Sequence, residues 1–321
     1  MALQSAEAPG QQVPPVYRKK KVSLLARLWK ERFIHMLVLP GLLYFIIYRY
    51  IPMGGLVIGF QDYSVFKGFL SSDWVGLKHF KELFSDKEVV RVILNTLYLS
   101  FLMLAVAFPV PIVLAIMLNE VKFEPFKRTM QSVLYLPHFF SWVIVVSLVT
   151  LFLKGEGILN NMLGDWFGIA PIQFLIKPDL FMPLIVAEAI WKESGWGTII
   201  YLAAIAGINP ELYEAAIVDG AGRWRKIWNV TLPGMRPTIV ILMILALGNV
   251  LDSGFEQIFL NLNAFTKQAG NVLDTYVYFK GIQDAQFSFA AAVGMFKSVV
   301  GFVLIIAANK FAKRMGGEGL F

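Results

Sequence analysis

The stretch that decides the architecture reads Glu214-Ala215-Ala216-Ile217-Val218-Asp219-Gly220 and, after nine intervening residues, Val230-Thr231-Leu232-Pro233. It is a polar, charged, helix-forming insert between two long apolar segments. A membrane protein that holds such an insert on its cytoplasmic side usually uses it to contact a soluble partner. The composition of the remaining chain shows whether this setting applies.

The chain has the composition of an integral membrane protein. Of its 321 residues, 57% are hydrophobic and 16% are charged, whereas soluble domains carry about 25% charged residues. The chain has no cysteine, which excludes disulfides and thiolate metal sites. Its net charge of +7 comes from basic residues beside apolar segments. This pattern favours a positive-inside membrane topology over nucleic-acid binding.

Six apolar segments are long enough to cross a bilayer, which takes about 20 residues of helix. All are predicted to be helices, because an open sheet edge cannot face lipid. The predicted fold is therefore an all-α membrane domain. The fourth segment is the weakest, since three charged residues interrupt it. The segments are Phe33–Pro52, Val92–Leu118, Gln131–Leu153, Phe181–Ile208, Pro237–Ile258 and Phe289–Phe311.

The connections between these segments predict the orientation of the chain. Lys and Arg gather in the N-terminal arm, in residues 119–130 and 209–236, and in the C-terminal tail, which places both termini in the cytoplasm. The connection 53–91 departs from this rule because it is also rich in basic residues, although its acids balance them. We expect a disordered basic arm at 1–21, an interfacial amphipathic helix at 22–32, a six-span domain at 33–311 and a tail at 312–321.

The insert itself has clear helix signals. Asn209 is a typical N-cap, Pro210 suits the first helical position, and Glu211 lies in the first turn, where the helix dipole favours an acid. An apolar stripe follows. The glycines at 220 and 222 predict a sharp turn, and a second short helix is expected from Arg223 to Val230. Pro233 and Pro237 are expected to close the insert and start the fifth span. The stripe consists of Leu212, Tyr213, Ala216 and Ile217.

A short helix with one apolar stripe suits docking into a groove of a partner protein. An ordinary inter-helix loop with a surface helix is the alternative. The spacing Glu-Ala-Ala, three residues, Gly, nine residues, an aliphatic, one residue, Leu-Pro resembles the EAA loop of bacterial ABC-importer permeases. Val230 stands where that family more often has Ile.

Other segments extend the resemblance to a six-span type I permease. Gly76-Leu77-Lys78-His79-Phe80 is similar to a Gly-Leu-x-Asn-Phe segment of the family, with His79 in place of Asn. Leu247-Gly248-Asn249 with Phe255-Glu256-Gln257, and Asp274-Thr275-Tyr276-Val277-Tyr278, resemble the polysaccharide-permease branch, to which alginate importers belong.

This resemblance implies an importer subunit of the bacterial cytoplasmic (inner) membrane. Its expected partners are a second permease in a heterodimer, two ATP-binding subunits that hold Mg-ATP, and an external solute-binding protein. No phosphate-binding Gly-rich loop is present in this chain, so no cofactor is expected on it and ATP hydrolysis is assigned to a partner. The implied ATPase-coupling residues are Glu214, Ala215, Ala216, Asp219, Gly220, Leu232 and Pro233.

Polar residues inside the spans are candidates for a substrate path, because such residues are costly in a bilayer and usually face a cavity or a partner. In the fifth span they fall on a narrow helical arc. In the fourth, Glu188 and Lys192 are four apart and could pair. Carboxylates, amides and indoles suit a sugar, although these groups could equally be structural contacts between helices. The candidates are Glu188, Trp191, Lys192, Trp196, Asn249, Asp252, Ser253 and Glu256.

The charge of these candidates leaves the substrate open. Most of the charged ones are acidic, so a uronate chain would need Lys192 or cations from the second permease. A neutral malto-oligosaccharide or another organic solute is the alternative cargo. A receptor or channel whose cytoplasmic loop binds a signalling protein is a rival of another class. A membrane-embedded enzyme would need an acid–base or metal cluster, which the sequence does not show.

Overall fold

The computed structural model describes residues 29–314, and these are almost entirely helical, as predicted. The predicted basic arm, most of the amphipathic helix and the last seven residues of the tail lie outside the described residues. The described chain separates into two units at Gly55 and Leu56. Each unit is described by itself.

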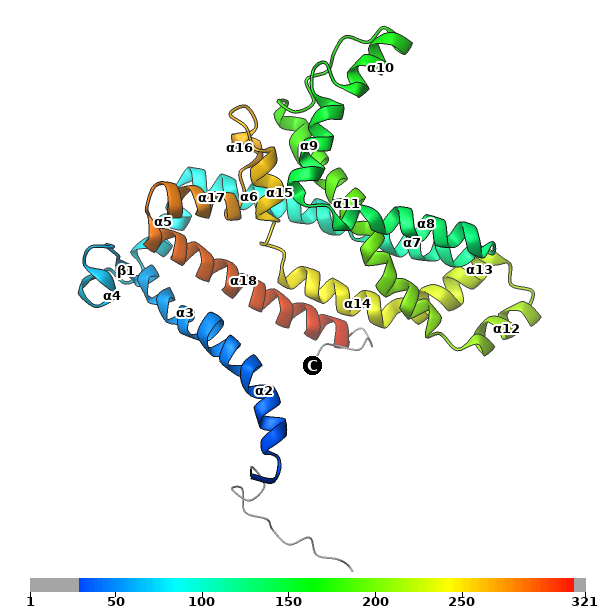
Figure 1. Cartoon of the computed structure of the whole chain (residues 1–321), viewed down its shortest axis with the longest axis horizontal. Coiled ribbons are helices and arrows are strands. Elements are labelled where there is room, and N and C mark those ends of the chain that lie inside the picture. Colours follow the sequence, from blue (N-terminus) through cyan, green and yellow to red (C-terminus); the bar gives the residue numbers. More distant parts are fainter. Residues whose placement is uncertain (1–28, 315–321) are drawn as a thin grey trace, which may run out of the picture. The chain divides into compact units, whose positions relative to one another are not determined.

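The first unit contains one helix that covers the predicted first span. It runs as α2 (Arg32–Phe45), a π-helical turn η1 (Ile46–Tyr50) and α3 (Ile51–Met53) (Figure 1). None of these residues is buried within the described chain. The absence of any charged residue between Arg32 and Arg49 suits a lipid-facing segment.

The second unit begins with a small subdomain and the second span. Strands β1 (Gln61–Asp62) and β2 (Asp73–Trp74) pair antiparallel. The span follows as α6 (Lys87–Leu102), η3 (Met103–Ala107) and α7 (Pro109–Glu120). The π turn η3 ends two residues before Pro109, which removes a backbone donor and tends to kink a helix. The shorter helices nearby are η2 (Gly54–Phe60), α4 (Gly68–Ser71) and α5 (Lys78–Ser85).

The third predicted span is broken rather than continuous. Helix α8 (Glu124–Tyr135) leads into the 3-10 turn η4 (Leu136–Phe139), and α9 (Trp142–Leu153) begins afresh behind Ser141, whose side chain accepts from the backbone N–H of Ile144. Pro137 explains the interruption, because its ring and missing donor oppose a continuing α-helix. Helix α10 (Ile158–Phe167) follows α9 and ends at Gly168 with φ 65°.

The fourth segment, α11 (Pro178–Ala206), is a 29-residue helix with eleven buried residues that packs against α7, α8 and α14. Five other helical runs in the described chain are long and apolar enough to cross a membrane. Helix α11 is not among them because its charged residues lie in mid-helix, although its length suffices. The five runs are Arg32–Phe60, Lys87–Glu120, Trp142–Phe167, Arg223–Gly248 and Phe287–Arg314.

The fifth predicted span is wrong in both of its boundaries. After α12 (Pro210–Val218), one continuous helix runs through α13 (Arg223–Lys226), η5 (Ile227–Thr231) and α14 (Leu232–Gly248). There is thus no separate second helix of the insert, and Pro233 does not end it. The π turn η5 precedes Pro233, which has no backbone N–H to donate. The wider turn lets the helix continue past the proline, as η3 does before Pro109.

The fifth span stops at Gly248. Residues 249–254 are irregular, and the short helix α15 (Phe255–Asn261) begins behind Gly254, which has φ 77°. The chain continues through α16 (Lys267–Gly270), α17 (Leu273–Tyr278) and η6 (Phe279–Gln283) to the long α18 (Phe287–Arg314), which covers the predicted sixth span.

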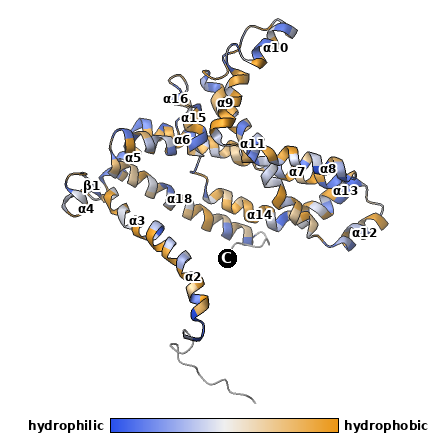
Figure 2. Cartoon of the chain, in the orientation of Figure 1, coloured by the Kyte–Doolittle hydropathy of each residue, from blue (hydrophilic) through white to orange (hydrophobic). Residues whose placement is uncertain are grey.

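The core of the second unit forms around these helices. Figure 2 shows apolar residues along α7, α9 and α14, whereas hydrophilic residues gather near α12 and α13. Helices α14 and α18 approach closely at Gly248 and Gly301, where a Cβ on Gly301 would lie 2.6 Å from the Gly248 carbonyl oxygen. Small residues allow such close contact between membrane helices.

Candidate functional site

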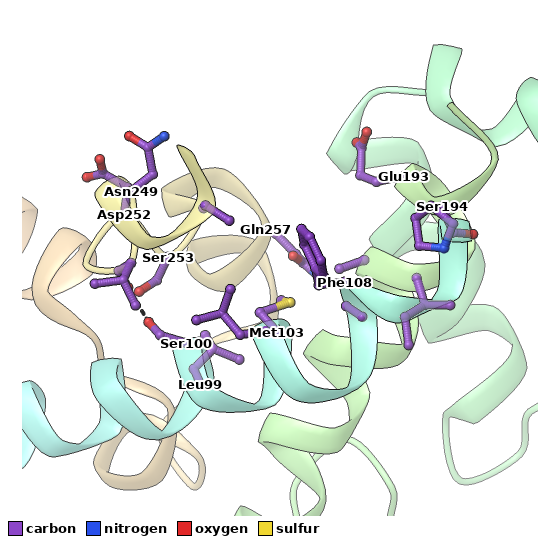
Figure 3. Close-up of a pocket in the computed structure, with 18 residues that line it drawn as sticks. Leu99, Ser100, Met103, Phe108, Glu193, Ser194, Asn249, Asp252, Ser253 and Gln257 are labelled. Carbon is purple, nitrogen blue, oxygen red and sulfur yellow. Dashed lines mark hydrogen bonds between the residues drawn. The ribbon is translucent and has the colours of Figure 1, made fainter. Parts of the chain in front are cut away.

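A cavity of about 390 Å³, with a mostly apolar lining and a few polar residues, lies beside the break in the fifth span. Its walls come from α6, η3 and α7, from the middle of α11, and from residues 246–257 (Figure 3). The break itself supplies Asn249, Asp252 and Ser253, while Glu193 and Ser194 lie on the opposite side. The fold thus brings polar residues of the fourth and fifth segments to one space.

The predicted narrow arc of the fifth span is wrong as a structure. It assumed a helix through residue 258, whereas the helix ends at Gly248 and resumes at Phe255. Asn249, Asp252 and Ser253 still border one cavity, but Glu256 is exposed on α15 and does not line it. Irregular backbone at membrane depth is tolerated where it borders a cavity rather than lipid.

A lysine-centred cluster holds the break from one side. Lys297 Nζ of α18 lies 2.7 Å from Asp252 Oδ1 and also pairs with Asp274 of α17. The other oxygen of Asp274 accepts a 2.9 Å hydrogen bond from the backbone N–H of Ser253. Lys297 is largely buried, at 12% side-chain exposure. One cation therefore fixes two acids and the backbone of the break.

Sequence reasoning missed Lys297 as a site residue and gave Asp274 only as part of a family segment. Lys297 follows Asp274 by 23 residues and Asp252 by 45, so no helical spacing connects them. A lysine ten residues inside an apolar span is itself the signal that could have found it, because an intramembrane charge points to a partner.

Glu188 holds the short helix α15 from the other side. Its Oε2 accepts from Gln257 Nε2 at 3.0 Å and from Asn261 Nδ2 at 2.9 Å, and the residue is 3% exposed. The predicted pair with Lys192 is not formed, because Glu188 faces α15 whereas Lys192 faces η4. Glu188 Oε1 has no partner within residues 29–314 and borders a separate apolar cavity beside Trp191.

Lys192 is neutralised by its neighbour. Its Nζ donates to Glu193 Oε1 at 2.9 Å and to the His138 carbonyl oxygen at 2.9 Å, and it lies 5.2 Å from the Trp142 ring centroid. The other oxygen of Glu193 lies 2.7 Å from His138 Nδ1. Lys192 is 6% exposed, so its charge is not open to the cavity.

Aromatic rings complete this cluster. The His138 ring stacks on Trp196 with centroids 4.5 Å apart and 6° between the planes, and Phe139 meets Trp196 edge-on at 5.9 Å. Trp196 and Trp191 keep 44% and 46% exposure in the described chain. The charged side chains lining the cavity, Glu193 and Asp252, are both acidic, and each has a cationic partner.

The insert forms as its local signals predict. Asn209 caps α12 by accepting from the backbone N–H of Glu211 at 3.1 Å, and Gly220 takes φ 72° in the turn. Gly222, in contrast, has φ −70°, so only the first glycine needs its conformational freedom. The Tyr213 hydroxyl lies 3.1 Å from Thr231 Oγ1 and connects α12 to η5.

The predicted coupling residues lie mostly at the surface. Glu214, Ala215, Asp219, Gly220 and Pro233 are exposed, and Ala216 and Leu232 are half-buried. Leu212 and Ile217 of the predicted apolar stripe are 54% and 59% exposed, and Val218, which is 87% exposed, lies on another face of α12. An exposed apolar stripe on a capped helix can enter a groove of another protein. No three metal-ligating side chains come together within residues 29–314.

Known proteins share this architecture along the whole chain. Residues 91–317 match the family described as the inner membrane component of binding-protein-dependent transport systems. The polygalacturonan/rhamnogalacturonan transport system permease protein YteP of Bacillus subtilis is 46% identical over 321 residues, with all of both chains covered. Protein LplB of the same organism is 46% identical, covering 96% of this chain and 97% of its own.

A solved structure agrees with these relatives. A permease chain in the crystal structure of a bacterial alginate ABC transporter, in complex with an alginate pentasaccharide-bound periplasmic protein, is 41% identical. It covers 92% of this chain and 99% of its own, with a TM-score of 0.86. Members of this family are transport components rather than enzymes. The chain belongs to the family of binding-protein-dependent inner-membrane transport components, as a permease of an ABC importer for oligo- or polysaccharides.

Proposed function

We propose that this permease imports acidic oligosaccharides released from a uronate-containing polysaccharide, of the pectin or alginate kind. The observation that carries the proposal is the end-to-end similarity to a polygalacturonan/rhamnogalacturonan permease at 46% identity, together with the 41% identity to an alginate-transporter permease. Polygalacturonan and alginate share one chemical feature, a carboxylate on the sugar ring.

In this proposal the chain forms half of the translocation path. A second permease supplies the other half, two ATP-binding subunits hydrolyse Mg-ATP, and an external solute-binding protein delivers the sugar. Both termini lie in the cytoplasm. The insert around α12 docks on an ATP-binding subunit through the exposed residues Leu212 and Ile217 of its apolar stripe, and Glu214 faces basic groups there. Closure of the ATP-binding subunits then moves α12 and, through Tyr213 and Thr231, the fifth span.

The cavity beside the break is the proposed path of the sugar. Asn249, exposed at the break, offers an amide to sugar hydroxyls. Trp191 and Trp196 do not line this cavity, but their partly exposed indoles on α11 offer stacking faces. The lining acids, Glu193 and Asp252, do not attract a polyanion. The cations that receive the uronate carboxylates are therefore assigned to the second permease and to the binding protein.

A neutral oligosaccharide is the second candidate cargo, and one observation favours it. Lys192, which the sequence offers as a cation for a uronate chain, is held by Glu193 and the His138 carbonyl and is not open to a carboxylate. A cavity lined by paired acids, amides and hydroxyls suits an uncharged sugar of the malto-oligosaccharide type.

Reconstitution of the complete transporter in nanodiscs tests these alternatives. The chain is co-purified with the products of adjacent genes, and ATP hydrolysis is measured with the binding protein and oligogalacturonides, alginate oligosaccharides or maltotriose. We expect stimulation by the two acidic sugars and none by maltotriose. Stimulation by maltotriose alone would replace the acidic cargo with a neutral one. A folded chain that recovers no ATP-hydrolysing partner would contradict the importer assembly.

A further inference from the structure

His79 joins two elements of the small subdomain that precedes the second span. It lies on α5 and is 7% exposed. Its ring Nδ1 lies 3.1 Å from Glu82 Oε2, three residues further along the same helix. Its Nε2 lies 3.1 Å from the backbone carbonyl oxygen of Gln61 on β1. Each ring nitrogen of His79 therefore faces an oxygen atom.

The number of protons on the ring decides how many of these contacts are hydrogen bonds. A carbonyl oxygen and an ionised carboxylate oxygen carry no proton, so both only accept. A neutral imidazole has one N–H, whereas a positively charged imidazolium has two. His79 can therefore donate to Glu82 and to Gln61 together only when its ring is charged. A neutral ring has one N–H for two acceptors, and both contacts weaken.

The charges around the ring balance when it is protonated. His79 borders a cavity of about 440 Å³ together with two acids and one lysine. Lys78 Nζ lies 3.9 Å from Asp62 Oδ2, so the lysine faces one of these acids. Residues 285–289, which line the cavity on the side of α18, carry no charge. An imidazolium beside Glu82 supplies the second positive charge. The titratable residues of the lining are Asp62, Tyr63, Lys78, His79 and Glu82.

Glu82 has charged neighbours on its other side as well. It borders an adjoining cavity of about 400 Å³ with Asp86, Tyr276 and Lys280. Lys280 Nζ lies 3.3 Å from Asp284 Oδ2, so an acid already neutralises this lysine. These groups bring no surplus positive charge to Glu82, and the nearest cationic partner of its carboxylate is the ring of His79.

The contact with Gln61 matters because the sheet is small. Strands β1 and β2 pair over two residues each, and a sheet of two short strands is marginally stable at best on its own. Strand β1 therefore depends on contacts with its surroundings. Directly behind it, the backbone N–H of Tyr63 donates to Ser288 Oγ at 2.9 Å, in the first turn of α18. The ring of His79 thus fastens a strand that also meets α18.

We propose that His79 is a pH-sensitive clasp, which fastens β1 to α5 when its ring is protonated and loosens when the ring is neutral. Imidazole side chains change charge within the physiological pH range. Because the charged ring makes both hydrogen bonds, the clasp is complete at acidic pH and weakens as the pH rises. In the topology of the proposed importer the connection 53–91 lies outside the cell, so the medium sets the state of the clasp. This last step rests on the proposed function.

NMR of the complete transporter in nanodiscs, with ¹⁵N-labelled histidine, tests the protonation directly. The chain has three histidines, and the signals lost in His79→Gln belong to His79. We expect two protonated ring nitrogens at about pH 6 and one at about pH 8.5. The same protonation state at both pH values would overturn the proposal.

Hydrogen exchange of β1 and α5 measures the consequence, always by comparing variants at one pH. Glutamine carries no charge at any pH, so His79→Gln represents the loosened clasp. At about pH 6 these segments should exchange about ten-fold faster in the variant than in the wild type, because a charge-assisted hydrogen bond is lost. At about pH 8.5 the difference should fall below about two-fold. An equal ratio at both pH values would contradict the clasp.

Two further variants sharpen this test. Glu82→Leu removes one acceptor, so a single N–H then suffices for Gln61, and exchange of β1 relative to the wild type should no longer depend on the charge of the ring. His35→Gln, on α2 in the other unit, is the matched control and should behave like the wild type at both pH values. Thermal melting in detergent shows that each variant is folded. A response of His35→Gln equal to that of His79→Gln would overturn the assignment to His79.

Sugar-stimulated ATP hydrolysis is measured on the same samples. The ratio of wild-type to His79→Gln activity should fall toward one as the pH rises. The NMR and exchange results do not depend on sugar or ATP, so failure of the clasp and failure of the import function are distinguishable.

Discussion

The insert around α12 and the break at residues 249–254 are both irregular features of an otherwise helical chain, but different forces hold them. Helix α12 has its own cap in Asn209 and its own turn at Gly220, and none of its residues is buried in the described chain. The break has no cap of its own and depends on Glu188, Asp274 and Lys297. Local chemistry thus builds the insert, whereas distant side chains build the break.

The largest effect is expected at the lysine of the break. Lys297→Met leaves Asp274, whose side chain is 18% exposed, without its cation, whereas Asp252 is 64% exposed and stays solvated. Removing one partner of such a cluster costs about 3 kcal/mol. We expect a lower melting temperature in detergent and loss of sugar-stimulated ATP hydrolysis. Lys310→Met on the exposed end of the same helix is the control. Equal melting temperatures for the two variants would show that the cluster does not hold the break.

The second effect concerns the other side of the break. Glu188→Leu leaves the amide groups of Gln257 and Asn261 without their shared acceptor, at a cost of about 1 to 3 kcal/mol. Glu188→Gln keeps one acceptor oxygen and should lose less. Hydrogen exchange of α15 measures the difference, with faster exchange expected in the leucine variant. If both variants exchange alike, the helix is held by its apolar contacts rather than by Glu188.

The third prediction concerns the insert and compares substitutions at its two glycines, Gly220 and Gly222. Gly220→Ala places a Cβ on a residue with φ 72°, which costs about 1 to 2 kcal/mol, whereas Gly222 has an ordinary φ of −70°. Neither Cβ would meet another atom within 4 Å. We expect Gly220→Ala to reduce coupled ATP hydrolysis while Gly222→Ala does not. Equal losses would mean that the turn conformation is not the cause.

The smallest effect is expected at the cap of α12. Asn209→Ala removes the acceptor for the Glu211 N–H and should cost about 1 kcal/mol. Asn209→Asp keeps an acceptor and should behave like the wild type. Hydrogen exchange in the first turn of α12 reports the fraying, and the melting temperature of the membrane domain should not move. A drop in that temperature would show that the insert stabilises the domain, contrary to its exposed position.

The two regions also differ in how well they could be predicted. The cap, the first-turn proline and the turn glycine of the insert were each assigned from neighbouring residue types, and each is where the sequence places it. The end of the insert could not be predicted in this way. Pro233 is expected to close the insert, but the helix continues past it through the π turn η5. Proline removes a donor in either case, and packing decides whether the helix stops.

The residues around the candidate cavity also differ in how well the sequence could predict them. Asn249, Asp252 and Ser253 could be singled out because polar residues in an apolar segment are unusual. The sequence could not identify their partner Lys297. It also could not predict the contacts that Glu188 and Lys192 make in the structure. Spacing of four residues suggested a pair within α11, yet each side chain found a partner on another element.

The sequence by itself determined the membrane class of this protein, the positions of its apolar segments, the local structure of α12 and its resemblance to importer permeases. These follow from hydropathy and from contacts between near neighbours in the chain. Only the tertiary structure decided where the third and fifth spans break and which residues line the cavity. In a membrane helix a buried charge or an open backbone group must find a partner wherever one exists, and that partner is set by packing, not by sequence distance.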